Sequence, residues 1–295
     1  MLKTRKFFSY KTVIHLFFIL LSLVFILPFV LIVSISFSEE SDVLRYGYSL
    51  IPRNFTTTAY TYVFSNMTSL LDAYKVTIIN SVVSTAISVI MMALTGYALS
   101  RENFAYKKFV NAFLVVTMFF SGGLIPSYVI NTRVFHLENS PFIYLFYNLV
   151  SAYTIFVFRT FFAQIPKSLV ESATLDGASE LQILTRITLP LSKPVIATFS
   201  FMGMITRWNQ FEPSLYYIRD KSLYTLQFLL QQVLNEAEFL KQAMKEMPEA
   251  MTNVALPSET LKFAICVLAA GPMICVFPFF QKYFSKGMVV GAVKG

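Results

Sequence analysis

Few side chains in this sequence have the types and the spacing that enzyme chemistry needs. Cys266 and Cys275 lie in one apolar run, and His15 and His136 are isolated from each other and from any other ligand. A structural metal site needs four ligands held together, so we read the cysteines as fillers of an apolar helix. No catalytic triad, phosphate-binding loop or HExxH pattern is visible. We therefore expect no catalytic residue, no metal site and no cofactor bound by this chain.

Two polar stretches next to apolar runs are candidates for function. The first, ESATLDGASELQILTRITLP at 171–190, holds three acids among apolar residues at helical spacing. The second consists of Arg207, Trp208, Asn209 and Gln210. An aromatic face beside guanidinium and amide groups offers a sugar both stacking and hydrogen bonds, so this stretch is a candidate part of a translocation path. Alternatively, Trp208 is a membrane-interface residue and Arg207 extends outward to water.

The composition places these stretches in a membrane protein. The chain of 295 residues is 56% hydrophobic and 14% charged, whereas soluble domains average about 25% charged residues. A helix needs about 20 apolar residues to cross a bilayer. The charge-free runs are 12–38, 76–100, 109–132, 139–158 and 263–281. A sixth candidate starts near Leu191, and its charge-free part follows Lys193 and ends at residue 206. We therefore expect an all-α membrane protein with six transmembrane helices.

The distribution of Lys and Arg gives the orientation, because cytoplasmic loops are enriched in these residues. One side carries 14 basic residues and four acids, in segments 1–11, 101–108, 159–193 and the tail after 281. We therefore place both termini and the 171–190 stretch in the cytoplasm. The first apolar run is too long for a cleaved signal peptide, which favours an uncleaved first helix. The net charge of +8 reflects this topology and not nucleic acid binding.

The residues of the loop 166–190 predict two short helices. Ser168 and Glu171 have the spacing of a capping box, in which a serine and an acid or amide bond each other's backbone N–H groups. Ser179 and Gln182 repeat this spacing before a second apolar run. We therefore expect one helix to start at each serine.

A turn at Asp176 and Gly177 separates the two predicted helices, because Asp-Gly is a turn signal and glycine allows a positive φ. An amphipathic loop that lies on the membrane surface without a partner fits this pattern. A docking site fits it as well, since the small residues Ser172, Ala173 and Ala178 allow close approach beside an acid that can pair with a basic partner. The residue pattern alone leaves both interpretations open.

The spacing of the loop resembles the EAA signature of the permease subunits of binding-protein-dependent ABC importers. That signature is E-A-A-x-x-x-G, nine further residues, then I-x-L-P. The matching positions here are Glu171, Ser172, Ala173, Gly177, Ile187, Leu189 and Pro190. Ser172 stands where the family has Ala, which is a conservative difference. The match is long and lies in a loop that the charge distribution places in the cytoplasm.

Other segments resemble the carbohydrate-uptake branch of this family. GYALSR at 96–101, RWNQF at 207–211 and KGMVVGAVKG at 286–295 are similar to the maltose-permease-type second subunit. PSETLKFA at 257–264 and FPFFQKYFSKG at 277–287 resemble a subgroup that imports complex oligosaccharides. The resemblance implies the type I importer fold, with a first part over 1–70, a transmembrane domain over 71–285 and a cytoplasmic tail over 286–295.

The resemblance also implies partners. A second permease subunit would form a heterodimer with this chain, a cytoplasmic ATPase dimer would bind ATP and Mg, and a lipid-anchored or periplasmic binding protein would deliver the sugar. The loop, with Ala178 beside its bend, would be a coupling helix between the fourth and fifth spans. Glu171 would pair with the ATPase, Gly177 would permit the bend and Asp176 would serve the turn. The complex would lie in the bacterial plasma membrane and bind no nucleic acid.

Three further features of the sequence each have more than one interpretation. Gly122, Gly123 and Pro126 predict a kink or break in the third run, which is either a gate or a packing kink. Residues 226–240 have helical apolar spacing, so they form a helix that either contacts the binding protein or lies on the membrane surface. The cargo could instead be an amino acid, a peptide or an ion. A secondary transporter is disfavoured, because the clear spans carry no acid for ion coupling.

Overall fold

The computed structural model describes residues 10–65, 67–246 and 259–291, and the all-α prediction is confirmed for them. Within these residues the backbone forms helices and no β-strand, although one isolated bridge pairs Ser38 with Phe55. Contacts divide the chain into two compact units. The first comprises residues 1–70 and 230–271, and the second comprises 71–229 and 272–295. The three-part division 1–70, 71–285 and 286–295 stays a prediction.

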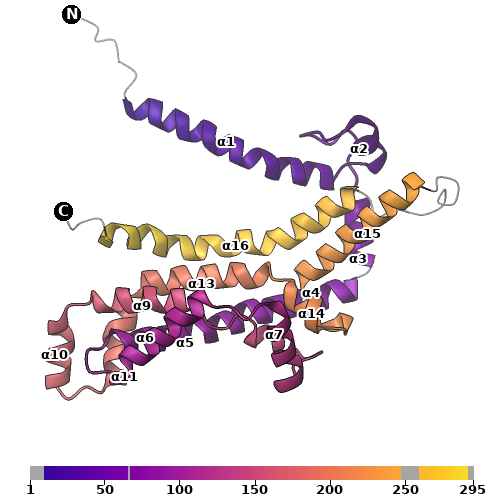
Figure 1. The fold of residues 1–295 in the computed structure, drawn as a ribbon. Coiled ribbons are helices and arrows are strands. Elements are labelled where there is room, and N and C mark those ends of the chain that lie inside the picture. The colour runs from indigo at the N-terminus through magenta and orange to yellow at the C-terminus, as the bar shows by residue number, and fades with distance from the viewer. Residues whose placement is uncertain (1–9, 66, 247–258, 292–295) are drawn as a thin grey trace, which may run out of the picture. The chain divides into compact units, whose positions relative to one another are not determined.

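The first unit is built around one long apolar helix. Its elements are α1 (Tyr10–Ser36), α2 (Glu40–Tyr46), α3 (Thr58–Ser65), most of α15 (Leu226–Glu246) and the start of α16 (Glu259–Gly291) (Figure 1). The buried residues of α1 are confined to its last turn, Ser34, Ile35 and Ser36. A helix that is apolar on all sides is typical of a membrane span. The predicted helix over 226–240 is confirmed as the larger part of α15.

The N-terminus of α16 is capped from a distance. The carboxylate of Glu40 accepts hydrogen bonds from the backbone N–H groups of Glu259 and Thr260, at 2.9 and 3.0 Å, and from the Thr260 hydroxyl at 2.9 Å. The first N–H groups of a helix have no partner within the helix, and an anion there is favoured by the helix dipole. Glu40 therefore fixes the beginning of α16 within the first unit.

The second unit contains the remaining helices, except for the first four residues of α4, together with the first turn of α15 and the C-terminal part of α16. Those before the loop are α4 (Met67–Ile79), the π-helix η1 (Asn80–Ser84), α5 (Thr85–Ser100), α6 (Lys107–Phe119), α7 (Leu124–Val129), the π-helix η2 (Ile130–Val134), α8 (Ile143–Phe146) and α9 (Ala152–Ala163). Those after α9 are α10 (Lys167–Leu175), α11 (Glu180–Ile183), the π-helix η3 (Leu184–Thr188), α12 (Leu189–Leu191), α13 (Lys193–Trp208), α14 (Glu212–Tyr217) and the 3₁₀-helix η4 (Lys221–Leu223).

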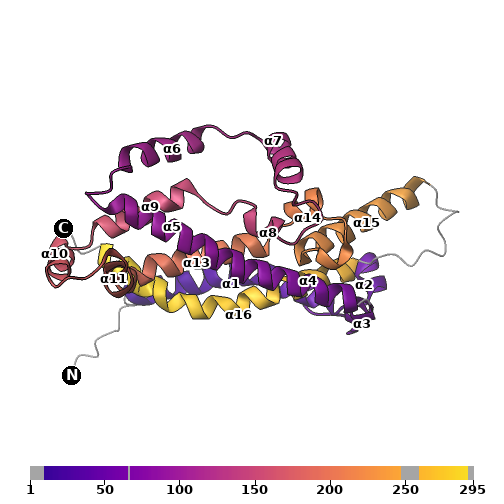
Figure 2. The ribbon, with the colours of Figure 1, turned by 90° about the horizontal axis from the view of Figure 1, so that it is seen from below.

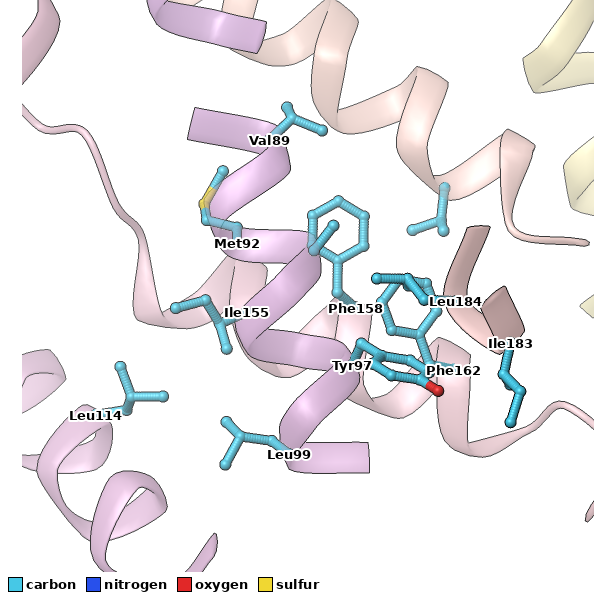
Figure 3. Close-up of a cluster of buried hydrophobic side chains, with 12 residues drawn as sticks. Val89, Met92, Tyr97, Leu99, Leu114, Ile155, Phe158, Phe162, Ile183 and Leu184 are labelled. Atoms are coloured by element: carbon cyan, nitrogen blue, oxygen red, sulfur yellow. The ribbon is translucent and has the colours of Figure 1, made fainter. Parts of the chain in front are cut away.

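The core of the second unit forms where α5 packs against α9 and α13. Figure 3 shows Tyr97 of α5 beside Phe158 and Phe162 of α9, whose rings stack with their centroids 5.7 Å apart. Gly96 allows the close crossing, because a Cβ there would lie 2.7 Å from the Phe158 Cβ and 3.1 Å from the Arg159 backbone nitrogen. α5 is therefore held tightly against α9.

The lengths of the helices agree with only some of the six predicted spans. Three described helical stretches, 10–36, 69–100 and 259–282, are long and apolar enough to cross a membrane. A fourth joins α6 to residues 124–134 if that bent pair is one span. α13 has only 16 residues. The full count of six and the orientation of the termini therefore stay predictions.

The prediction of one continuous helix over 139–158 is wrong. The structure has the four-residue helix α8 and then the twelve-residue helix α9. Between them the backbone is extended at Tyr147 and at Ser151, and Asn148 has a φ of +52°. The Ser151 hydroxyl accepts the N–H of Thr154, which starts α9 anew. Apolar composition alone did not reveal this N-cap inside the run.

The third apolar run breaks at its glycines. α6 and the helical segment 124–134 meet at 117° (Figure 2). Gly123 has a φ of +81°, a value that glycine adopts at little cost. Gly122 lies beside it in the break, and Pro126 lies within the first turns of α7. A gating role for this break stays a prediction.

Candidate functional site

The candidate coupling loop begins at α10. Pro166 is the N-cap residue, with φ −54° and ψ 124°, and no side chain caps this helix. The predicted capping box of Ser168 and Glu171 is therefore wrong. Because Pro166 already holds the extended conformation that an N-cap requires, the helix starts at Lys167. Ser168 thus lies inside its first turn, and both Ser168 and Glu171 are exposed.

The bend that follows α10 is a Schellman motif, a helix end in which two backbone bonds close around a left-handed residue. Gly177 has a φ of +79°. The N–H of Ala178 bonds the carbonyl of Ala173 at 2.9 Å, and the N–H of Gly177 bonds that of Thr174 at 3.0 Å. Asp176 is the C-cap residue. The predicted two helices bent at Gly177 are thus confirmed.

The small residues of the loop have a structural role. Ala173 and Ala178 are partly buried against the core cluster of the second unit, whereas Ser172 is exposed. In a Schellman motif the residues at these two alanine positions often make an apolar contact. The small size of Ala173 and Ala178 is therefore explained by packing inside this chain. Of the three small residues Ser172, Ala173 and Ala178, only Ser172 is exposed to a partner.

The second helix of the loop, α11, starts as the sequence predicted. The Ser179 hydroxyl accepts the N–H of Gln182 at 3.3 Å, and the Gln182 Oε1 accepts the N–H of Ser179 at 2.8 Å, which completes a capping box. Ile183 and Leu184 then enter the core beside Phe162 (Figure 3). The loop is thereby packed against α5 and α9.

Glu180 connects the loop to α5, a role that the sequence analysis missed. Its Oε2 accepts a hydrogen bond from the Tyr97 hydroxyl at 2.5 Å, and its Oε1 pairs with the Arg101 Nη2 at 2.9 Å. Burial raises the pKa of this carboxyl, but the hydrogen bonds from Tyr97 and Arg101 and the charge of Arg101 outweigh burial, so the pKa of Glu180 lies below its ordinary value. Glu180 is therefore a charged link between loop and core.

A second ion pair crosses the same region. Lys167 at the start of α10 pairs with Glu102, and its hydrogen bond lowers the pKa of Glu102 and raises that of Lys167. Both side chains are exposed, so this pair contributes little to stability. A hollow of about 1030 Å³ lies between α10 and the end of α5, and Glu171 lines it together with Glu180.

The outer face of the loop is apolar at its bend. Leu175, the last residue of α10, is 89% exposed, and Leu181 of α11 is also exposed. Two large apolar side chains exposed on one face of the loop, beside the exposed Glu171, make this face a candidate contact surface. The downstream signature residues Ile187 and Leu189 are partly buried against the core, whereas Pro190 is exposed.

The loop lies at one end of the second unit. In Figure 2, α10 and α11 lie beside the end of α5 and far from α8 and α14. Arg101, Lys107 and Lys167 gather there, since the Lys107 Nζ donates to the Arg101 carbonyl at 3.1 Å and Lys167 pairs with Glu102. Two of the four segments that the charge distribution assigned to one side of the membrane, 101–108 and 159–193, are thus adjacent in space.

The second candidate site is the end of α13. Arg207, Trp208 and Gln210 are buried, and only Asn209 is exposed. Asn209 donates from its Nδ2 to the Ile205 carbonyl at 2.9 Å, so it serves the helix end. The Trp208 ring lies 6.5 Å from the ring of Tyr74 in α4. The burial of Arg207 argues against the alternative in which it extends outward to water.

Together, the long apolar helices and the anchored amphipathic loop define a membrane-embedded transport component. The chain belongs to the family described as the binding-protein-dependent transport system inner membrane component, which matches residues 2–290. It is therefore a permease subunit of an ABC importer and not an enzyme.

Known proteins support this assignment. The chain is 35% identical to Protein LplC of Bacillus subtilis, over 92% of this chain and 90% of the relative. It is 33% identical to the polygalacturonan/rhamnogalacturonan transport system permease protein YtcP of the same species, over 97% and 98%. A chain in the crystal structure of a bacterial ABC transporter involved in the import of the acidic polysaccharide alginate superposes with a TM-score of 0.78. That chain is 28% identical, with 96% of this chain and 99% of that chain covered.

Proposed function

We propose that this chain is one of two permease subunits of an ATP-driven importer that moves a sugar or oligosaccharide across the bacterial plasma membrane. The names of the similar proteins support a carbohydrate cargo, since they refer to polygalacturonan, rhamnogalacturonan and alginate, all of which are chains of sugars. The coupling loop would serve an amino acid, peptide or ion importer equally well, so the preference for carbohydrate rests on these names. The family match favours an importer over a secondary transporter.

The observation that carries the coupling mechanism is the two-faced construction of the loop. Its inner face is fixed by Glu180 on Tyr97 and Arg101, while its outer face exposes Glu171 and Leu175. A cytoplasmic ATPase that seats the outer face and changes shape would move α5 with the loop. Such a movement is the rigid-body alternating access of a transporter. Glu171 pairs with a basic residue of the ATPase, and Leu175 fills an apolar recess beside it.

The partners follow from this mechanism. A second permease subunit forms a heterodimer with this chain, and an ATPase dimer binds ATP and Mg, so that this chain needs no cofactor. A lipid-anchored or periplasmic binding protein delivers the cargo on the opposite side, where α15 is a candidate contact. Lipid surrounds the spans, and nucleic acid has no part. The end of α13, from Arg207 to Gln210, lies along the path of the cargo.

The proposed topology has six spans with both termini in the cytoplasm. The spans are α1, α4 to α5, α6 to η2, α8 to α9, α13 and α16. This topology places Leu175 inside and Ser222 outside. With Cys266 and Cys275 replaced by Ser, a membrane-impermeant maleimide should label Ser222→Cys in intact cells and Leu175→Cys only after permeabilisation. Labelling of Leu175→Cys in intact cells would refute the orientation.

The direct test of the proposal is purification of the chain from membranes with its ATPase. Glu171→Ala should weaken the recovery of the ATPase, and Leu175→Asp should abolish most of it, because a buried unpaired charge in an interface costs several kcal/mol. Glu138→Ala is the matched control, since this acid lies outside the loop and pairs with Arg219. Full recovery of the ATPase with both loop variants would overturn the coupling assignment.

A further inference from the structure

The interior of the second unit holds a cationic side chain with unpaired nitrogen atoms. Arg207 is 7% exposed, and its Nε and Nη2 atoms are buried with no hydrogen-bond partner among the residues that the structure describes. None of the ion pairs found among residues 10–65, 67–246 and 259–291 involves this guanidinium. A buried, unpaired charge is costly and is kept in a membrane protein mainly where it serves a function.

The position of the guanidinium follows from Gly203, one turn earlier on α13. A Cβ at Gly203 would lie 3.7 Å from the Arg207 Nη1, 3.4 Å from the Thr85 Oγ1 and 3.0 Å from the Thr85 Cγ2. The Arg207 side chain therefore runs back along its own helix, as long helical side chains do. It lies beside Thr85 at the start of α5. The absence of a side chain at Gly203 leaves the room for this arrangement.

Four other buried polar atoms, at the end of α13 and on the helix that contacts it, also lack a hydrogen-bond partner among the described residues. They are the Asn80 Nδ2, the Ser81 Oγ, the Thr85 Oγ1 and the Gln210 Oε1. The continuous helical stretch α4–η1–α5 contacts α13 at two points, through the Tyr74 and Trp208 rings and through Thr85 beside Gly203. Asn80 and Ser81 lie between Tyr74 and Thr85 in the sequence. They belong to the π-helix η1, a feature that is frequent at functional sites. Hereafter Arg207 and these four residues are the polar cluster.

The chemistry of the polar cluster selects a ligand. A guanidinium presents a planar fork of donors that matches a carboxylate with two parallel hydrogen bonds. The hydroxyl and amide groups beside it match sugar hydroxyls. A neutral sugar would satisfy the hydroxyl and amide groups but leave the charge unmatched. A buried polar atom left unpaired is unfavourable, so a ligand that pairs all of them gains most.

We propose that the polar cluster is a binding site for the carboxylate of a uronic acid unit in the transported oligosaccharide. This inference rests on the proposed sugar cargo. It adds that the sugar is negatively charged and that this subunit binds its charged group. The cluster is closed in this conformation. The sugar therefore reaches it when α13 moves relative to α5 during alternating access.

The test uses the whole complex, purified with its partner subunit and ATPase and without the binding protein. Galacturonic acid trisaccharide and the same trisaccharide after carboxyl reduction are titrated, and binding is followed by the fluorescence of Trp208, with Trp208→Phe as the background. The wild type should prefer the acidic trisaccharide by about tenfold or more, because hydrogen bonds to charged groups are worth about 1.5–3 kcal/mol. Equal affinity for the two would overturn the proposal.

Two variants locate the preference. Arg207→Gln should abolish it, and Arg207→Lys should retain only part of it, because lysine keeps the charge and loses the fork. The matched control Arg219→Gln, an exposed arginine paired with Glu138, should behave as the wild type. A preference that survives in Arg207→Gln overturns the proposal. So does loss of the second permease subunit from both Arg207 variants, since Arg207 would then serve assembly.

Recovery of the ATPase tests the proposed function separately from the carboxylate site. If the ATPase does not purify with the wild-type chain, the proposed function itself fails. If the ATPase is recovered and hydrolyses ATP, but the acidic trisaccharide is not preferred, only the carboxylate site fails. Thr85→Val removes one hydroxyl of the cluster without a change of charge. It should weaken both trisaccharides by a few-fold and leave their ratio unchanged.

Discussion

At the scale of single residues, Glu180 explains how a surface loop is joined to a membrane helix. Its carboxylate meets Tyr97 and Arg101, which lie one turn apart at the end of α5. The pKa of Glu180 lies below its ordinary value of 4.5. The stabilisation by its charged form is therefore present above pH 4.5 and is lost as the pH falls through the lowered pKa. Near neutral pH the link is intact.

Glu180→Gln should lower ATP-driven uptake while the ATPase remains bound. The substitution removes the ion pair with Arg101, and partly exposed pairs are worth about 0.2–1 kcal/mol, so uptake should fall about two- to fivefold. The measurement is sugar uptake by proteoliposomes together with recovery of the ATPase. Glu102→Gln, which removes only the exposed pair with Lys167, is the control. Equal uptake by the two variants would show that Glu180 does not transmit motion.

Some of these residue roles could be predicted from the sequence and others could not. Gly177 and the pair Ser179 and Gln182 were predictable, because turns and capping boxes depend on neighbours in the chain. The capping box at Ser168 was wrong, because Pro166 had already set the helix start. Glu180 could not be assigned, because its partners lie about 80 residues earlier and only the folded chain brings them together.

At the scale of elements, α5 is the helix that joins the two candidate sites. Its end carries Tyr97 and Arg101 against the coupling loop, and its start carries Thr85 beside Gly203 and the guanidinium of Arg207. Between these ends it packs tightly on α9 through Gly96. α5 therefore contacts both the coupling loop and the end of α13. The apolar runs in the sequence predicted long helices. They did not predict which helices pack against each other or where a helix is interrupted.

Gly96→Ala tests the tight crossing of α5 and α9. The new methyl group would meet the Phe158 Cβ and the backbone of Arg159, and overpacking of this kind costs about 1–3 kcal/mol. The thermal unfolding temperature of the purified complex should fall. Gly271→Ala is the matched control, because a Cβ at this helical glycine meets nothing within 4 Å. A melting temperature equal to that of the control would contradict the tight packing of α5 on α9.

At the scale of the whole molecule, the central claim is that the coupling loop converts the shape change of an ATPase into movement of the permease helices. Family membership establishes that the chain is a permease subunit of an ABC importer. The contacts of Glu180 with Tyr97 and Arg101 connect the coupling loop to α5. The claim requires the bend at Gly177 to keep its geometry during the cycle, because the bend sets how the outer face meets the ATPase.

The most direct measurement is ATP-driven sugar uptake by reconstituted complexes with Gly177→Val or Gly177→Asn. At a φ of +79°, asparagine is tolerated and a β-branched residue is strained by about 1–3 kcal/mol. A Cβ here meets nothing within 4 Å in this chain, so within the permease the strain lies in the backbone, and Gly177→Asn controls for the presence of a side chain at the contact with the ATPase. We predict that Gly177→Val lowers uptake about tenfold and that Gly177→Asn retains most of it. Uptake by Gly177→Val at the wild-type rate would contradict the claim that the bent loop couples ATP hydrolysis to transport.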